Sequence, residues 1–253
     1  MVPAIFEPFA KGFLSFAQLR KGEDILDVAC GTGIVARLAW PQTAPSGRVA
    51  GLDVNAAMLD VARSRSAKDQ APIEWQEGDV ASMPISDDAF DVVLCQHGLQ
   101  YVSDKRAALI EMHRVLRASG RLVLSVWRPV QHNPGHAVFA DVLDRHVSEA
   151  AGVTRRAPFT LSDRDELRAL VADADFHDIV VRLDARVARF PSAEAMVQIM
   201  MAGTPLAAEM ADADAAVLRN VIAEVTAGLS EYNDDQGLAL PMQAWVVTAK
   251  ASH

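Results

Sequence analysis

The 253-residue sequence has little cysteine, no excess of positive charge and no long apolar run, and each shortage excludes a class of protein. Its two cysteines, Cys30 and Cys95, belong to no C-x-x-C pair or Cys/His cluster, which disfavours a disulfide framework and a metal site. The formal net charge of -9 repels nucleic-acid phosphates and favours a small-molecule partner over DNA or RNA. No apolar run approaches the roughly 18 residues of a membrane span. The first residues lack the basic and apolar regions of a signal peptide. We therefore expect a cytoplasmic, reduced protein without a metal.

What the sequence contains is an ordinary globular composition, 51% hydrophobic and 23% charged, which suits one domain over residues 1–253. Short apolar segments alternate with helical patterns through the first half, which predicts a doubly wound α/β fold with a parallel sheet. The predicted strands cover residues 24–29, 47–54, 73–79, 90–96 and 121–127. The predicted helices cover residues 33–40, stopped by Pro41, residues 55–68, capped by Asn55, and residues 104–119, stopped by Gly120.

The second half predicts a different organisation. A helix is expected after the loop that begins at residue 132, and another over residues 161–176, with Ser162 or Asp163 as its cap. Two strands follow, over residues 177–183 and 243–250. About fifty mostly helical residues, 189–240, separate these strands, too many for a turn. This helical insertion is either an accessory layer or a lid over a substrate pocket.

The N-terminal segment, residues 1–22, spaces its phenylalanines at roughly helical intervals. Phe6, Phe9, Phe13 and Phe16 form this stripe. The pattern is explained either by simple packing on the sheet or by a helix that covers a ligand site.

A glycine turn between the first strand and the first helix allows two interpretations. Residues 31–36 fit G-x-G-x-x-A, a dinucleotide fingerprint, and residues 27–33 fit D-x-A-x-G-x-G, which indicates S-adenosylmethionine (SAM). Both need glycine because a Cβ would keep a ligand away from the backbone. Both also expect an acid at the end of the second strand to accept ribose hydroxyls, here Asp53.

Three features favour SAM. Asp27 lies ahead of the glycines, where a carboxylate suits a sulfonium and an ammonium better than a pyrophosphate; the alternative role for Asp27 is to cap the amides of the loop. Asp79 follows the third strand, where an acid or a neighbouring amide can bind the adenine amino group, although a plain turn residue also fits. The region after the fourth strand contains no recognisable apparatus for hydride transfer.

Four segments in order resemble the class I SAM-dependent methyltransferases, in particular the group that includes the ubiquinone and menaquinone C-methyltransferases. They are "ILDVACGTG", "VAGLDVNAAMLDVAR", "WQEGDVASMPISDDAFDVVLCQHGLQYVSD" and "HRVLRASGRLVLSVW", within residues 25–127. The resemblance implies a Rossmann-like seven-stranded sheet whose last strand is antiparallel and whose two C-terminal strands are paired.

The resemblance also implies a set of cofactor-binding residues, for SAM and for its product S-adenosylhomocysteine. Ala29, Gly31 and Gly33 would line the methionine end, and Asp53 would hold the ribose. Around the adenine we expect Met58 against its face and Asp79 and Val80 at its edge, while Gln96 would lie near the methyl group. Asp27 and Val54 complete the set. Ala29 departs from the glycine of many relatives, but alanine is the smallest replacement.

Candidates for the acceptor side follow the fourth and fifth strands, where ligands meet a doubly wound sheet. His97 is a candidate general base, or a polar residue that only shapes the pocket. Tyr101 would orient substrate or form part of a wall, and His132 and His136 would contact substrate. The two histidines enclose a Pro-Gly pair and have no third ligand nearby, so no metal is expected.

These observations predict an enzyme that methylates a small molecule on oxygen, nitrogen or carbon. Two alternatives stay open: a catalytically silent SAM-binding module and an NAD-dependent oxidoreductase. A nucleic-acid substrate is disfavoured again, because "CQHG" stands where the related DNA amino-methyltransferases carry a Pro-Pro-aromatic run. The sequence names neither the acceptor nor the oligomeric state, since a fold does not fix its substrate.

Overall fold

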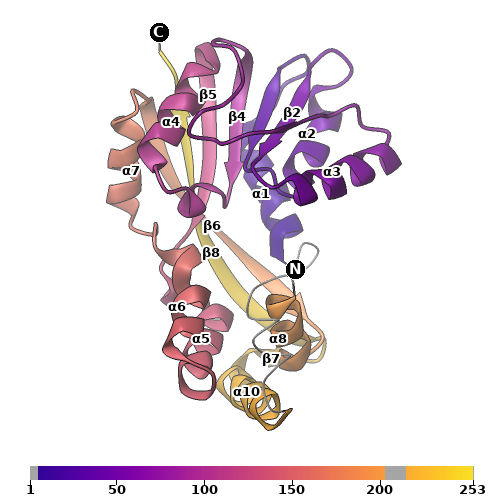
Figure 1. Ribbon diagram of the computed structural model, residues 1–253, viewed down its shortest axis with the longest axis vertical. Helices are drawn as coiled ribbons and strands as arrows, with labels where there is room; N and C mark the ends of the chain where they lie inside the picture. Colours follow the sequence, from indigo (N-terminus) through magenta and orange to yellow (C-terminus); the bar gives the residue numbers. More distant parts are fainter. Residues whose placement is uncertain (1–4, 203–214, 253) are drawn as a thin grey trace. The chain divides into compact units, whose positions relative to one another are not determined.

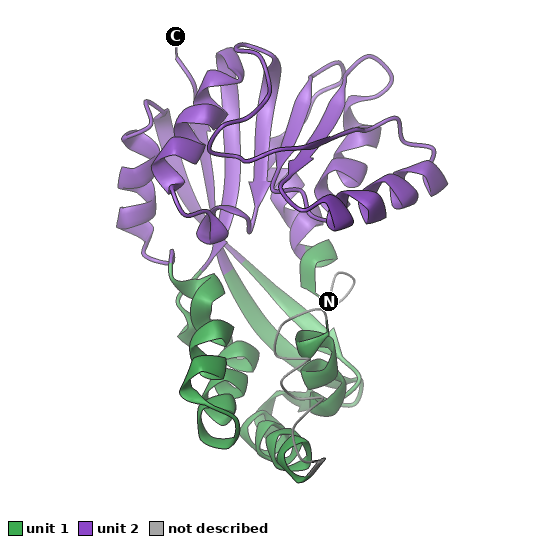
Figure 2. Ribbon diagram, in the orientation of Figure 1, with its two compact units in different colours: residues 1–8, 128–160, 185–243 green, residues 9–127, 161–184, 244–253 purple. Residues whose placement is uncertain are grey.

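The computed structural model describes residues 5–202 and 215–252, which gather into two compact units (Figure 2). Unit 1 comprises residues 1–8, 128–160 and 185–243, and unit 2 comprises residues 9–127, 161–184 and 244–253. Strands β6 (His177–Phe190) and β8 (Gly237–Lys250) each contribute residues to both units. The organisation as one domain over residues 1–253 stays a prediction.

The sheet is doubly wound, with the strand order β3-β2-β1-β4-β5-β8-β6, and the short β7 (Asn233–Asp234) pairs with β8 (Figure 1). Its first five strands are β1 (Ile25–Val28), β2 (Val49–Asp53), β3 (Glu74–Glu77), β4 (Phe90–Gln96) and β5 (Leu116–Trp127). Neighbours among these five are parallel, whereas β8 runs antiparallel to β5. The predicted Rossmann-like sheet, with its last strand antiparallel and its two C-terminal strands side by side, is confirmed.

Helices cover both faces of this sheet in unit 2, as the apolar runs of its central strands require. On one face, α1 (Glu7–Ala17) and α2 (Ile34–Thr43) bury apolar residues against β1, β4 and β5. On the other face, α4 (Lys105–Arg114) and α7 (Arg164–Ala172) do the same. The helix α3 (Ala56–Lys68) begins at Asn55, whose side chain accepts a hydrogen bond from the Met58 N–H at 3.2 Å, as predicted.

Two predicted helix ends are wrong. Pro41 does not stop α2, which continues to Thr43, so the helix tolerates the missing Pro41 N–H donor two residues before its end. The helix α4 ends at Arg114 rather than at Gly120. Its last expected turn is strand instead, because Leu116 pairs with Phe90 as β5 joins the sheet and is fully buried there.

Unit 1 is mainly helical apart from β7 and its shares of β6 and β8. It contains α5 (Pro134–His146), α6 (Glu149–Arg156), α8 (Ala193–Met201) and α10 (Ala215–Gly228), with the short 3-10 turns η3 (Val130–His132), η4 (Ala157–Phe159) and η5 (Ser230–Tyr232). The predicted insertion over 189–240 is helical in α8 and α10, and its residues 203–214 lie outside the described residues. Within the described parts of the chain, no helix has the length and apolar character that crossing a membrane requires.

Candidate functional site

The loop between β1 and α2 has the tight backbone that its glycines predict. Three of its residues have positive φ: Ala29 at 52°, Gly31 at 53° and Gly33 at 75°. The Cys30 N–H donates to the Leu52 carbonyl at 3.1 Å and so fastens the loop to the end of β2. This arrangement leaves the loop at the carboxyl edge of the sheet, where ligands bind in doubly wound folds.

The two glycines of the loop are small for different reasons. A Cβ on Gly31 would meet nothing closer than the Met58 Sδ at 3.7 Å, so a ligand can approach this backbone. A Cβ on Gly33 would lie 2.3 Å from the Trp75 ring, and so would a Cβ on Gly51. Trp75 therefore fills the space beside the loop, and its ring requires a glycine at position 33. Gly33 as a cofactor contact stays a prediction.

Asp27 lies under this loop and is almost completely buried. Its Oδ2 accepts a hydrogen bond from the Ala36 N–H, in the first turn of α2, at 3.0 Å. Burial, and to a smaller extent the charge of nearby Asp53, raise the pKa of the Asp27 carboxyl to about 8, against the lowering effect of the Ala36 hydrogen bond. The group is therefore largely protonated at neutral pH in the ligand-free protein, and a cationic ligand would favour its ionised form.

Asp53, at the end of β2, is the second acid of the site. Its Oδ2 accepts a hydrogen bond from the Gly31 N–H at 2.7 Å, and its Oδ1 accepts one from the Asn55 N–H at 2.9 Å. Each carboxylate oxygen keeps a further lone pair, so these bonds still allow hydroxyl donors. Just beyond it, Val54 and Met58 are 71% and 44% exposed, which provides an apolar surface beside the carboxylate.

The end of β3 lies next to the end of β2, because the Gly78 N–H donates to the Asp53 carbonyl at 3.1 Å. Asp79 follows with an exposed side chain that accepts a hydrogen bond from the Ala81 N–H at 2.9 Å, while Val80 is buried. The predicted adenine-edge residues therefore border the same edge of the sheet as Asp53.

At the end of β4, His97 is enclosed by aromatic rings. Its ring stacks on Trp127 with centroids 3.7 Å apart and an interplanar angle of 6°, and Phe9 meets both rings edge-on at centroid distances of 5.7 and 4.9 Å. Burial lowers the pKa of His97 to about 3. His97 is therefore a neutral imidazole at physiological pH and a weak base.

Two further residues after β4 differ sharply in exposure. Tyr101 is 65% exposed, whereas Gln100 is buried. Neither amide atom of Gln100 has a hydrogen-bond partner among the residues that the structure describes. Tyr101 as a substrate contact stays a prediction.

The two histidines after β5 lie in unit 1, and each faces an arginine. The Arg128 guanidinium donates to His132 Nε2 at 3.1 Å, and the Arg155 guanidinium donates to His136 Nδ1 at 2.7 Å. An arginine only donates, so His136 carries its proton on Nε2, and this buried N–H has no acceptor within the described ranges. Burial, and then the Arg155 charge, hold the pKa of His136 well below its usual value.

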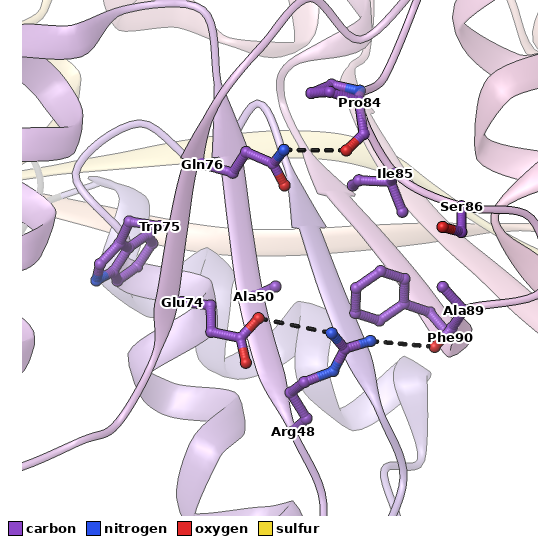
Figure 3. Close-up of a pocket in the computed structure, with 10 residues that line it drawn as sticks. All are labelled: Arg48, Ala50, Glu74, Trp75, Gln76, Pro84, Ile85, Ser86, Ala89 and Phe90. Atoms are coloured by element: carbon purple, nitrogen blue, oxygen red, sulfur yellow. Dashed lines mark hydrogen bonds and ion pairs between the residues drawn. The ribbon is translucent and has the colours of Figure 1, made fainter.

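A separate open cavity of about 550 Å³ lies at the opposite edge of the sheet (Figure 3). Its lining includes Arg48, Glu74 and Phe90, which stand at the beginnings of β2, β3 and β4. There Arg48 bonds the Ala89 carbonyl and lies 4.6 Å from the Phe90 ring centroid. Since ligands of doubly wound sheets bind at the carboxyl ends of the strands, this cavity is not the candidate site.

Sequence reasoning missed Trp75, Ser125 and Trp127. Trp75 supports the glycine loop, while Ser125 and Trp127 end β5 on the face that α1 covers. The alternation of β5 could have found the last two, since they continue the face of Val123. No signal in a single sequence connects Trp75 to a glycine 42 positions earlier.

The residues at the carboxyl edge fit SAM in this structure. The space over Gly31 admits a ligand to the loop, Asp53 and Asp27 supply carboxylates for hydroxyl and cationic groups, and Val54 and Met58 supply an apolar rim. Within residues 5–202 and 215–252, no cluster of three or more metal-ligating side chains is found.

Comparison with known proteins agrees with this geometry. Residues 26–124 match the family model described as a methyltransferase domain. Demethylmenaquinone methyltransferase from Symbiobacterium thermophilum is 31% identical over 188 residues, which cover 68% of this chain and 75% of the relative.

Solved structures show the same fold. The YcgJ protein from Bacillus subtilis aligns with a TM-score of 0.65 at 20% identity, over 97% of this chain and 99% of that one. Phosphoethanolamine N-methyltransferase 2 from Haemonchus contortus, solved with S-adenosylhomocysteine, aligns with a TM-score of 0.61 at 18% identity. That alignment covers 97% of this chain and 53% of the other.

Proposed function

Because this chain belongs to the class I SAM-dependent methyltransferases, we propose that it methylates a ring carbon of a small quinol-like acceptor. SAM is its cofactor and methyl transfer its reaction. The observation that carries the acceptor class is the match to a demethylmenaquinone methyltransferase, whose 188 aligned residues extend beyond the 99-residue methyltransferase motif region. The alignment therefore includes chain outside the cofactor motifs.

In this proposal the unit 2 residues at the carboxyl edge bind the cofactor. Asp53 accepts the ribose hydroxyls, Met58 and Val54 cover the adenine, and the open backbone at Gly31 admits the methionine part. The bound sulfonium supplies an activated methyl group, so little covalent chemistry is required of the protein. Asp27 would ionise beside the bound cation and stabilise it.

The ionisation of His97 supports a carbon acceptor. A histidine whose pKa is about 3 takes up a proton poorly at neutral pH, and His136 is likewise held neutral. An oxygen or nitrogen acceptor often needs a base, whereas an ionised quinol attacks the methyl group with the electron pair of a ring carbon, and the proton on that carbon then leaves to water as the aromatic ring re-forms. The proposed task of His97 is to shape the acceptor pocket with Trp127 and Phe9.

The experiment is methyl transfer from labelled SAM to a panel of acceptors. It contains a reduced 2-unsubstituted 1,4-naphthoquinol, kept anaerobic, a simple phenol and a primary amine. The proposal expects turnover on the naphthoquinol and a product whose new methyl group is on carbon by NMR. Methylation on oxygen, or turnover on the amine alone, would overturn it. Intact SAM binding without any turnover would instead indicate a silent SAM-binding module.

The pH profile of the same reaction tests the role of His97. With its pKa near 3, we expect no histidine ionisation in the rate between pH 5 and 8. His97→Ala should then lower the rate, because packing is lost, and leave the shape of the pH profile between pH 5 and 8 unchanged. A limb near pH 6.5 that disappears in His97→Ala would restore the general-base interpretation.

The remaining expectations belong to the same proposal. Its partner is a small molecule rather than a nucleic acid, on the grounds of charge and of the "CQHG" segment, and its location is cytoplasmic. His132, His136 and Tyr101 are proposed substrate contacts. Residues 189–240 and the N-terminal segment, residues 1–22, are proposed to close over the substrate.

A further inference from the structure

One face of the sheet in unit 2 carries a row of polar side chains along its carboxyl edge. Strand pairing aligns Asp27 with Gly51 on β2 and with Leu94 on β4, and Leu94 aligns with Val123 on β5. Side chains alternate along a strand, so the residues two positions further on point to the same face. In order across the sheet, these residues are Asp53 on β2, Ala29 beyond β1, Gln96 on β4 and Ser125 on β5.

The end of this row on β4 and β5 carries two buried polar atoms that lack hydrogen-bond partners among the described residues. Ser125 is 2% exposed, and its Oγ has no hydrogen-bond partner among the described residues. The Nε2 of Gln96, the residue paired with Ser125 across β4 and β5, is also buried and lacks an acceptor in the same part of the chain. A buried polar atom without a partner destabilises the fold, so such a pair indicates a bound water or ligand atom.

The surroundings of the pair are aromatic. Trp127 follows two positions after Ser125 on the same face, and His97 follows Gln96 and donates its N–H to the Ser125 carbonyl at 2.9 Å. The stacked rings of His97 and Trp127 therefore border the two polar groups. Aromatic walls with two hydrogen-bonding groups suit a planar ring that carries an oxygen.

Gln96 and Ser125 lie at increasing distances from Asp53 along this row. Neighbouring strands lie about 4.8 Å apart, so Gln96 is about 10 Å and Ser125 about 14 Å along the sheet from Asp53. Asp53 is the proposed ribose site, which leaves the Ser125 end for groups beyond the cofactor.

We propose that the Ser125 hydroxyl and the Gln96 amide form a subsite that binds a carbonyl, hydroxyl or phenolate oxygen of the methyl acceptor. This inference rests on the proposed function for the identity of the acceptor. It makes Ser125 a specificity-determining residue, because an acceptor without an oxygen at this position would leave both groups unpaired.

The decisive variant is Ser125→Ala, which removes one buried hydroxyl and keeps the rest of the side chain. We expect the KM for the reduced 1,4-naphthoquinol to rise between about twofold and tenfold, as for the loss of one neutral hydrogen bond. SAM affinity by calorimetry should stay unchanged. The Tm of the ligand-free variant should not fall, because an unsatisfied buried hydroxyl has been removed. Gln96→Leu should raise the KM in the same way, and the two effects should not add.

Thr43→Val is the matched control. Thr43 is completely buried at the end of α2, and its hydroxyl donates to the Trp40 carbonyl at 3.3 Å. Removing this satisfied hydroxyl should lower the Tm and leave the KM unchanged, the opposite of Ser125→Ala. If Ser125→Ala lowers the Tm and leaves the KM unchanged, Ser125 is structural and the inference is overturned.

Binding without turnover separates this inference from the proposed function. Oxidised 1,4-naphthoquinone and naphthalene, which has no oxygen, are titrated into the S-adenosylhomocysteine complex of wild type and of Ser125→Ala. The inference expects wild type to prefer the quinone and Ser125→Ala to lose that preference. If wild type prefers the quinone and Ser125→Ala loses that preference, but the quinol is not methylated, the proposed function fails and the subsite stands. Turnover with an unchanged preference in the variant overturns the subsite alone, and a wild type that neither binds nor methylates overturns both.

Discussion

The methyl group of Ala29 occupies the space that a methyl group at position 98 would need. Moving the methyl group from position 29 to position 98, with Ala29→Gly and Gly98→Ala, therefore tests the geometry of the site. A Cβ added to Gly98 would lie only 2.5 Å from the Ala29 Cβ. Carbon atoms in contact prefer about 3.5–4.0 Å, so Gly98→Ala overpacks the junction between the glycine loop and the end of β4. Gly98 has an ordinary φ of -104°, which leaves the clash as the main cost.

The magnitude follows from these terms. Overpacking of a well-packed site costs about 1–3 kcal/mol, which is the expected loss for Gly98→Ala. Ala29→Gly relieves a φ of +52°, worth about 1–2 kcal/mol. It also loses a methyl contact worth about 0.8 kcal/mol and raises the entropy of the unfolded chain by about 0.4–1 kcal/mol. These terms nearly cancel, so Ala29→Gly alone should be close to neutral.

The double variant decides the matter. With Ala29→Gly in place, the methyl group of Gly98→Ala occupies the vacated space, so the double variant should regain most of the lost stability. Urea unfolding of the four proteins gives the coupling energy, expected at about 1–3 kcal/mol in favour of the pair. SAM affinity should fall in Gly98→Ala and recover in the double variant. A stable Gly98→Ala, or a coupling near zero, would refute the described packing of this loop.

Four further results are expected. Gly33→Ala should destabilise the fold by about 2–5 kcal/mol, because its Cβ meets a ring at 2.3 Å and the residue also has a positive φ, whereas Gly31→Ala should cost only the strain of its positive φ, about 1–2 kcal/mol; urea unfolding that ranks them equally would count against this. Asp53→Ala should lower both SAM affinity and stability, each by about 1–3 kcal/mol, since two backbone N–H groups lose their acceptor; calorimetry that finds unchanged affinity would remove Asp53 from the cofactor site. SAM affinity should rise with pH and level off above about pH 8, because the cation favours ionised Asp27, and Asp27→Asn should abolish that rise. Hydrogen exchange in the described parts of 189–240 should slow when S-adenosylhomocysteine and the quinol are added together, and protection limited to the cofactor motifs would argue against a lid.

Much of unit 2 could be predicted because its signals are local. The strand β4 matched its predicted bounds, Phe90–Gln96, since an apolar run between turn residues admits little else. The cap Asn55 was also predicted correctly, and of the two candidates Ser162 and Asp163 the structure has Asp163. Both were accessible because each side chain accepts from amides only two or three residues away. In contrast, the length of β5 depends on its pairing with Phe90, a contact that a local pattern does not contain.

The candidate site divides in the same way. The loop and Asp53 were predictable from spacing, because the glycine turn and the strand-end acid recur at fixed distances along the chain. The packing of Trp75 against Gly33 was not predictable, since Trp75 comes from another strand. The ionisation of His97 was equally inaccessible, because its burial is created by Phe9 and Trp127, one from each end of the first half of the chain.

Two ionisable groups of the proposed site, Asp27 and His97, carry little charge in the ligand-free protein. Asp27 is mostly protonated at neutral pH because its pKa is about 8, and His97 is neutral because its pKa is about 3. Burying both groups in their neutral forms avoids the cost of an unpaired buried charge. In the proposed cofactor site, a bound cation would favour loss of the Asp27 proton to solvent, so Asp27 would be charged only when the cofactor is present. In the proposed site, Asp27 would favour SAM over its product, because once the sulfonium has become a thioether Asp27 would take up a proton from solvent and its attraction for the ligand would weaken.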